Sequence, residues 1–312
     1  MIFHIRYFGI ILFILGPFSL TGQEFEFLET KEGISLLEND NPRFFYRTVP
    51  VDINSRFVRA NYIHPLYGLD GELLTEDFPD DHPHHHGIFW SWHQLYAEGK
   101  RIGDPWLNEG IEWKVIKTET QVRCKKAVLN SEILWMDTLN SRAVLKENLT
   151  ITFNRVEKDA YTLEFEIKLK ALLDGVAIGG SEDDKGYGGF SARLRLPEDV
   201  SFHSVGGNVE PQNLPVTAGP WMNISGICNS QVVMMGEPEN LSRYQGWILR
   251  SANSMQNMAF PGQTPLDIKK GDTISFRNQL LVHRNLSREK IMVHYLKFRG
   301  DMFFKNRSGL EN

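Results

Sequence analysis

The sequence predicts an all-β fold, a single large antiparallel β-sandwich, and two observations carry this prediction. Apolar and polar residues alternate with a period of two along several segments, most clearly over residues 149–154 and 163–170. Such alternation is typical of antiparallel strands with one buried and one solvated face. A single segment, residues 287–299, carries the signals of a capped helix. We therefore expect one C-terminal helix, packed at the edge of the sandwich.

The first 22 residues differ from the rest of the chain. Arg6 precedes an apolar run from Phe8 to Leu15, which ends at Gly16-Pro17. A basic start, a short apolar centre and a small-residue exit describe a secretory signal peptide, and the run is short for a membrane span. We expect a signal peptide over 1–22, a single β-sandwich domain over 23–312, and a periplasmic or secreted protein. The alternative is an uncleaved N-terminal anchor.

Composition narrows the class of partner. The 312-residue chain has a formal net charge of −5, which argues against a nucleic-acid partner because such proteins usually present a basic face. After residue 22 no apolar run is long enough for an integral membrane span. The two cysteines, Cys124 and Cys228, either pair or remain buried thiols, and their spacing does not decide between these.

The strands are expected in order along the chain. Short apolar runs alternate with turn signals over residues 24–59, and residues 58–68 indicate a strand that turns into a loop. Residues 69–72 carry the residue types of a tight turn. The two-residue period then recurs from 111 to 169, over 190–196 and over 274–282. Between these, residues 179–189 contain five glycines without a phosphate-loop pattern, which indicates a hinge-like loop carrying Asp183 and Lys185.

The most unusual stretch is the histidine run His82-Pro83-His84-His85-His86, which Gly87 and an aromatic strand follow directly. Imidazole can act as general acid or base near neutral pH and can bind metal ions. In an extended strand His84 and His85 would point to opposite faces. A bend at Pro83 or Gly87 is therefore required if both are to line one pocket.

Candidate site residues follow from this run. The catalytic candidates are His82, His84 and His85, paired with a carboxylate from Asp183, Glu210 or Glu237. The acidic residues before the run either orient the imidazoles or are solvated loop residues; they are Glu76, Asp77, Asp80 and Asp81. The candidates for substrate binding are Arg59, Tyr62, His64, Trp90, Trp92, His93, Lys185, Arg193 and Asn240.

Three classes of function remain open on these residues. The first is an exported carbohydrate-active enzyme, a hydrolase, lyase or epimerase, in which histidines move protons and Trp90, Trp92 and Trp106 stack on sugar rings. The second is a non-catalytic glycan-binding protein. The third is a metal protein with a divalent ion on His82, His84 and either His85 or His93. The first two classes require no cofactor and take a carbohydrate or small-molecule ligand.

Several motifs resemble the bacterial family labelled PmoA-like. The matching segments are 61–68, 74–79, 82–87, 186–190 with Arg193, 219–221, Pro238 with Asn240, and 270–272. The label implies a helical methane-oxygenase subunit embedded in lipid, but the family members resemble exported β-sandwich proteins of polysaccharide-degrading bacteria. The resemblance extends to the galactose-mutarotase-like sandwich, which implies histidines and a carboxylate acting on a sugar ring. In the family pattern the position of His86 is often arginine, so His86 is the least secure ligand of the run.

Overall fold

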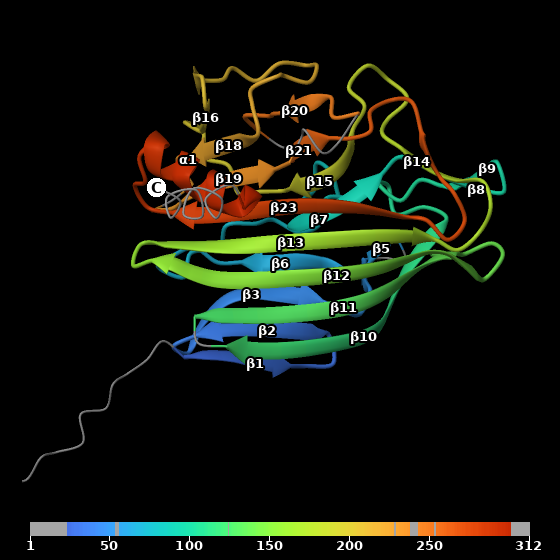
Figure 1. Cartoon of the computed structure of the whole chain (residues 1–312), viewed down its shortest axis with the longest axis horizontal. Helices are drawn as coiled ribbons and strands as arrows, with labels where there is room; N and C mark the ends of the chain where they lie inside the picture. The colour runs from blue at the N-terminus through green and yellow to red at the C-terminus, as the bar shows by residue number, and fades with distance from the viewer. Residues whose placement is uncertain are drawn as a thin grey trace, which may run out of the picture.

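Two large antiparallel sheets lie face to face in the computed structural model, which confirms the predicted β-sandwich (Figure 1). Every strand pair in both sheets is antiparallel, as the two-residue period predicts. The structure describes residues 24–53, 56–123, 125–227, 229–237, 243–252 and 254–300.

An eight-stranded sheet forms one layer, in the order β1-β2-β3-β6-β7-β15-β21-β20. Its N-terminal part is a meander of hairpins, and β15, β20 and β21 join it from much later in the chain. The strands are β1 Phe25–Glu29, β2 Gly33–Glu38, β3 Asn41–Arg47, β6 Tyr62–Leu66, β7 Ile88–Trp92, β15 Gly188–Ala192, β20 Gly246–Ile248 and β21 Gln256–Ala259.

A nine-stranded sheet forms the other layer, in the order β10-β11-β12-β13-β23-β19-β18-β16-β17. Its long central strands lie in front of the first sheet in Figure 1. The strands are β10 Ile111–Arg123, β11 Lys126–Asp137, β12 Arg142–Glu157, β13 Ala160–Ala171, β16 Ser201–Ser204, β17 Gly207–Asn208, β18 Trp221–Ser225, β19 Gln231–Gly236 and β23 Thr273–His283.

Two small sheets complete the fold. A four-stranded sheet has the order β22-β14-β8-β9, and β4 pairs with β5. Their strands are β4 Val51–Ile53, β5 Arg56–Arg59, β8 Gln94–Ala97, β9 Lys100–Gly103, β14 Val176–Gly179 and β22 Leu266–Ile268.

The main core lies between the two large sheets and follows the predicted alternation. Leu149, Ile151 and Phe153 of β12 are buried, whereas the threonines between them are only partly buried or exposed. One charged residue breaks the pattern, because Glu147 is fully buried in the same strand. Its carboxylate accepts hydrogen bonds from the Nε1 atoms of Trp90 and Trp135 at 2.9 and 2.8 Å, which offsets part of the cost of burying it.

The helix α1, Arg288–Arg299, has the predicted caps: the Ser287 side chain accepts from the backbone N–H of Lys290, and Gly300 is left-handed with φ of 82°. Its apolar face is also as predicted, since Ile291, Tyr295 and Phe298 are buried. Its position is different. The helix packs against the outer face of the nine-stranded sheet rather than at the edge, because it covers apolar side chains of β13, β18, β19 and β23.

Some sequence predictions lie outside the described residues. The signal peptide over 1–22 is one, and both cysteines are others. Within the described residues, no helix is long and apolar enough to cross a membrane.

Candidate functional site

The histidine run forms a β-turn rather than an extended strand. The backbone N–H of His85 donates to the carbonyl of His82 at 2.9 Å, with Pro83 and His84 at the two central positions. Proline favours the first central position of such a turn because its φ is fixed. The required bend therefore lies at Pro83, and it brings His84 and His85 together with ring centroids 4.6 Å apart.

The turn also stacks its first and last imidazoles. The rings of His82 and His85 are 4.7 Å apart and nearly parallel, with an interplanar angle of 3°. The ring of His82 lies 5.7 Å from that of His84, so the three form a compact group. This group, together with His93, is called the histidine cluster below.

Strand β7 positions the floor beneath the cluster. Its residues alternate, so that Ile88, Trp90 and Trp92 face the main core while Phe89 faces the other side of the sheet. On that outer side Phe89 packs with Trp106 at 5.3 Å, and the ring of His85 meets the edge of Trp106 at 6.0 Å. Trp106 reaches this position from the loop that follows β9, where its backbone N–H donates to the carbonyl of Trp92.

Asp81 orients His82. Its Oδ2 lies 2.6 Å from Nδ1 of His82, and Arg193 donates to both oxygens of the same carboxylate at 2.8 and 3.0 Å. Burial acts to raise the pKa of Asp81, but the hydrogen bonds from Arg193 and His82 outweigh it and hold the pKa below its ordinary value. The carboxylate only accepts, so Nδ1 of His82 carries the proton and Nε2 is left as the basic nitrogen. The His82 side chain is 41% exposed.

A second pair repeats this arrangement at His93. Its Nδ1 lies 2.9 Å from Oδ2 of Asp104, and the guanidinium of Arg101 lies 3.6 Å from the same oxygen. The imidazole stacks on Trp106 with centroids 5.3 Å apart. The structure thus contains two Arg–Asp–His series. The histidine of the first series, His82, stacks on His85, and the histidine of the second, His93, stacks on Trp106.

His84 and His85 lie between the two pairs and are neutral near pH 7. Burial lowers the pKa of His84 to about 4, and nearby His82 and His93 add to the effect. Burial lowers the pKa of His85 still further. Nδ1 of His85 is buried and has no hydrogen-bond partner among the described residues. An unpaired buried nitrogen is costly, so Nδ1 of His85 lowers the stability of the turn.

Three predicted binding residues are buried in the interior instead. Trp90 and Trp92 are each 1% exposed, and Trp106, the tryptophan beside the histidines, is 2% exposed, so none of the three offers an open ring face to a sugar. The physical reason is strand alternation, which turns the rings of Trp90 and Trp92 into the core. Arg59 is fully buried over the ring of Trp113 and donates to the carbonyl of Trp90 at 2.8 Å.

Three further residues support the turn from behind. His86 uses both ring nitrogens, with Asp77 at 2.8 Å and Asn108 at 3.0 Å. The hydroxyl of Tyr62 donates to the second oxygen of Asp77 at 3.0 Å. Nδ1 of His64 is bonded to the hydroxyl of Thr75 at 3.0 Å. Asp77 and Asp81 therefore orient imidazoles, the first of the two roles considered for the acidic residues.

The glycine-rich loop places Lys185 and Tyr187 near Trp106, but it does not supply the predicted catalytic carboxylate. Asp183 bonds within its own loop, to the hydroxyl of Ser181 at 2.6 Å and to the backbone N–H of Lys185 at 3.2 Å. The carboxylates that contact cluster imidazoles are instead Asp81 and Asp104. Lys185 lies over the ring of Tyr187 at 5.7 Å, and that ring is 5.9 Å from Trp106.

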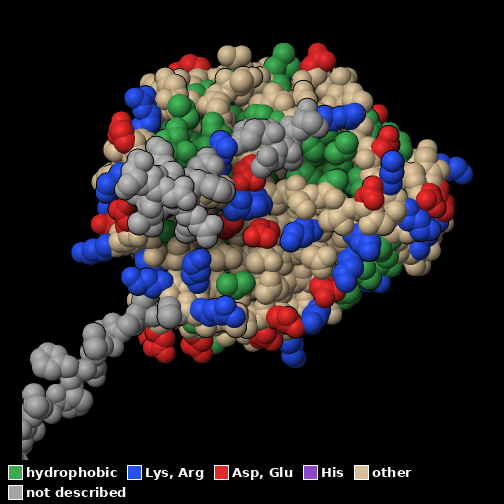
Figure 2. All heavy atoms as spheres, viewed as in Figure 1, with side chains coloured by type: hydrophobic (Ala, Val, Ile, Leu, Met, Phe, Trp, Pro, Cys, Tyr) green, Lys and Arg blue, Asp and Glu red, His purple; other side chains and the backbone are tan. Residues whose placement is uncertain are grey.

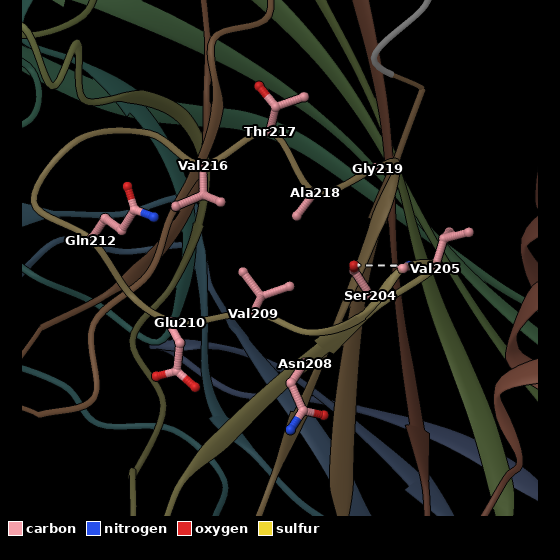
Figure 3. Close-up of a pocket in the computed structure, with 11 residues that line it drawn as sticks. Ser204, Val205, Asn208, Val209, Glu210, Gln212, Val216, Thr217, Ala218 and Gly219 are labelled. Atoms are coloured by element: carbon pink, nitrogen blue, oxygen red, sulfur yellow. Dashed lines mark hydrogen bonds between the residues drawn. The ribbon is translucent and has the colours of Figure 1, made fainter.

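The other two candidate carboxylates lie in different surroundings. Glu237 is ion-paired with Arg277 at 2.7 Å. Glu210 lines an open hollow of about 460 Å³, shown in Figure 3, whose wall contains none of the cluster histidines. Asn240, the last predicted binding residue, lies outside the described residues.

The described residues offer no group of three or more His, Cys, Asp or Glu side chains placed to hold a metal ion. Nδ1 of His82 and Nδ1 of His93 are already bonded to carboxylates. Nε2 of both rings is therefore the nitrogen that can exchange a proton or bind another ligand, and the neutral His84 and His85 lie between the two rings.

Sequence reasoning missed Asp104 and Arg101 as site residues. Arg101 lies in β9 and Asp104 directly follows that strand, 15 and 18 residues after His86. Aspartate and tryptophan on either side of Pro105 were the available signal, but only the fold brings them back beside His93.

Fold and site together define an antiparallel β-sandwich protein that presents a histidine cluster on the outer face of its eight-stranded sheet. The chain belongs to the family described as "Family of unknown function (DUF6807)", whose model matches residues 33–295. That description carries no methane-oxygenase label. No curated protein matches the chain.

Two solved structures show distant similarity. One is a heparan sulfate lyase HepC mutant from Pedobacter heparinus, with 9% identity and a TM-score of 0.41, covering 86% of this chain and 36% of that one. The other is a GalM/aldose epimerase homologue from C. elegans, with 9% identity and a TM-score of 0.37, covering 85% of this chain and 100% of that one. This chain thus spans about a third of the length of the lyase.

Proposed function

We propose that the protein is an exported enzyme that acts on a sugar or glycan by acid–base chemistry at the histidine cluster. The observation that carries the proposal is the pair of Arg–Asp–His series, Arg193–Asp81–His82 and Arg101–Asp104–His93, around one aromatic floor. Two oriented imidazoles can supply the acid and the base that hydrolysis, elimination and epimerisation each require.

The roles of the individual residues follow from their contacts. His82 and His93 each have Nδ1 bonded to a carboxylate, which leaves Nε2 to take or return a proton. Their carboxylates stabilise the imidazolium that forms when a proton is taken. His85 is buried and neutral, and its ring stacks on that of His82, so it supports the ring of the reacting imidazole.

A carbohydrate is favoured over other substrates on two grounds. Polar imidazoles lie near the partly exposed ring of Tyr187, which packs on the buried Trp106, and sugars bind such mixtures through hydroxyls and C–H faces. The PmoA-like motifs, which include the histidine run itself, resemble those of exported proteins of polysaccharide-degrading bacteria. Export rests on the signal peptide predicted over residues 1–22.

A glycan-panel screen tests the proposal. The wild-type chain is expected to convert at least one glycan, and His82→Gln or His93→Gln should each lower turnover by about a hundredfold or more. His203→Gln, on β16, is the matched control and should retain activity.

Two results would contradict the enzyme proposal. If a glycan binds without conversion and both variants bind it equally, the protein is a non-catalytic glycan-binding protein. If elemental analysis of untagged, active protein finds a stoichiometric metal that His84→Ala removes, the metal class holds instead.

A further inference from the structure

A groove on the opposite side of the molecule is independent of the histidine cluster. It has a volume of about 470 Å³ and lies on the outer face of the nine-stranded sheet beside helix α1. Figure 2 views this outer face, on which basic and acidic side chains are interspersed. The lining residues are Lys126, Thr152, Asn154, Val156, Thr162, Glu164, Gln279, His294, Lys297 and Phe298.

Strand register places the floor of the groove in two polar rows. Lys126 pairs with Asn154, which pairs with Thr162, across β11, β12 and β13. The neighbouring row runs from Thr152 through Glu164 to Gln279 on β23. With strands about 4.8 Å apart, the floor is roughly 14 Å wide from β11 to β23. That width suits an extended chain molecule with several hydrogen-bonding groups.

Several polar side chains of the groove floor make no hydrogen bond to the described residues. Gln279 is only 6% exposed, yet its side-chain amide makes no hydrogen bond to any described residue. The amide of Asn154 and the hydroxyl of Thr152 likewise make none within the described part of the chain. These groups line the groove, so a ligand seated there can make the hydrogen bonds that they do not make to the described residues.

The charged side chains of the groove indicate the sign of the charge that its ligand carries. Glu164 shares the guanidinium of Arg277 with Glu237, each at 2.7 Å, and His294 lies 3.4 Å from Glu157. Lys126 and Lys297 have no ion-pair partner among the described residues, so the groove is left with excess positive charge. An anionic ligand is complementary to it, although the chain as a whole is negative.

We propose that this groove binds an acidic oligosaccharide, with its hydroxyls on the amides and hydroxyls of the floor and its carboxylate or sulfate groups on Lys126 and Lys297. The amide and hydroxyl rows favour a polyhydroxylated chain over a lipid headgroup or a peptide. The groove would hold the protein on a charged glycan without taking part in turnover, so the inference does not depend on the proposed function.

Isothermal titration calorimetry on the full chain tests binding at the groove and does not require an activity assay. The probes are tetragalacturonate, a chondroitin sulfate tetrasaccharide, cellotetraose and a short double-stranded DNA. We expect at least one of the two acidic tetrasaccharides to bind. Binding of tetragalacturonate would show that carboxylates suffice, and binding of the chondroitin sulfate alone would show that sulfate is required, because that probe carries both groups. Lys126→Ala/Lys297→Ala should weaken binding about tenfold, because charge-assisted hydrogen bonds are lost, and Gln279→Leu should weaken it severalfold.

The matched control is Lys168→Ala/Lys170→Ala, which removes the same charge from the same sheet outside the groove and should leave affinity unchanged. The proposal is overturned if no acidic probe binds, if cellotetraose or DNA binds equally well, or if the control weakens binding as much as the groove variant. His82→Gln should bind the acidic probe normally, so loss of turnover and loss of this groove are separable.

Discussion

The carboxylate of Asp81 lies 2.6 Å from Nδ1 of His82, and each of its oxygens accepts a hydrogen bond from the guanidinium of Arg193. Arg193 is 3% exposed and is held in turn by Glu76 at 2.7 Å. The imidazole is therefore fixed by a rigid partner rather than by a freely rotating surface carboxylate. This distinguishes the histidine run from a solvated surface loop.

Asp81→Asn should lower turnover about tenfold or more while leaving the KM for the glycan nearly unchanged. The amide keeps the shape of the side chain but loses the charge that stabilises the imidazolium of His82. Steady-state kinetics on the glycan found by screening provide the measurement. Asp80→Asn, the exposed neighbour, is the control, and an equal loss in both variants would contradict the role of Asp81.

Asp104→Asn should likewise lower turnover, because His93 loses the charged acceptor that fixes its Nδ1–H and the neutral amide accepts only weakly. The NMR signal of that ring proton, protected by a 2.9 Å hydrogen bond in the wild type, should broaden through faster exchange with water. Glu109→Gln, in the same loop, serves as the control. A variant with normal turnover and a sharp Nδ1–H signal would show that Asp104 does not position His93.

Acid should destabilise the folded protein through His84. Its pKa is about 4 when folded, against an ordinary value of 6.5, so the unfolded chain binds the proton more readily. The stability that this group contributes is complete above pH 6.5 and is lost as the pH falls toward 4. His84→Gln should therefore lose less Tm than the wild type between pH 7.5 and 5. Equal losses in the two thermal scans would contradict the burial of His84.

Glu147→Gln should destabilise the fold by about 1–3 kcal/mol. The carboxylate accepts three N–H donors, from Trp90, Trp135 and Asn61 at 2.8–2.9 Å. An amide presents its own donors to part of this set and leaves at least one N–H unpaired. Urea denaturation measures the change, and Glu166→Gln, on the outward face of β13, should be nearly neutral. A stability equal to the wild type would show that the network contributes little.

Much of the fold could be predicted from the amino-acid sequence. Alternation along residues 149–170 set which side chains are buried, because a strand turns successive residues to opposite faces. The helix could be placed within one residue, since Ser287 and Gly300 are local capping signals. The prediction that it lies at the edge was wrong, because the apolar residues it covers come from four strands distant in sequence.

The site divides in the same way. From the sequence alone, His82, His84 and His85 converge if the chain bends at Pro83 or Gly87, and the bend at Pro83 is a local event. Only the tertiary structure decided that Arg193 holds Asp81, that Asp104 contacts His93, that Trp90 and Trp92 are core residues, and that Asp183 stays within its own loop. The physical reason is that strand pairing and sheet packing join residues far apart in the sequence, such as Asp81 and Arg193 at 112 positions, and no local pattern encodes such a contact.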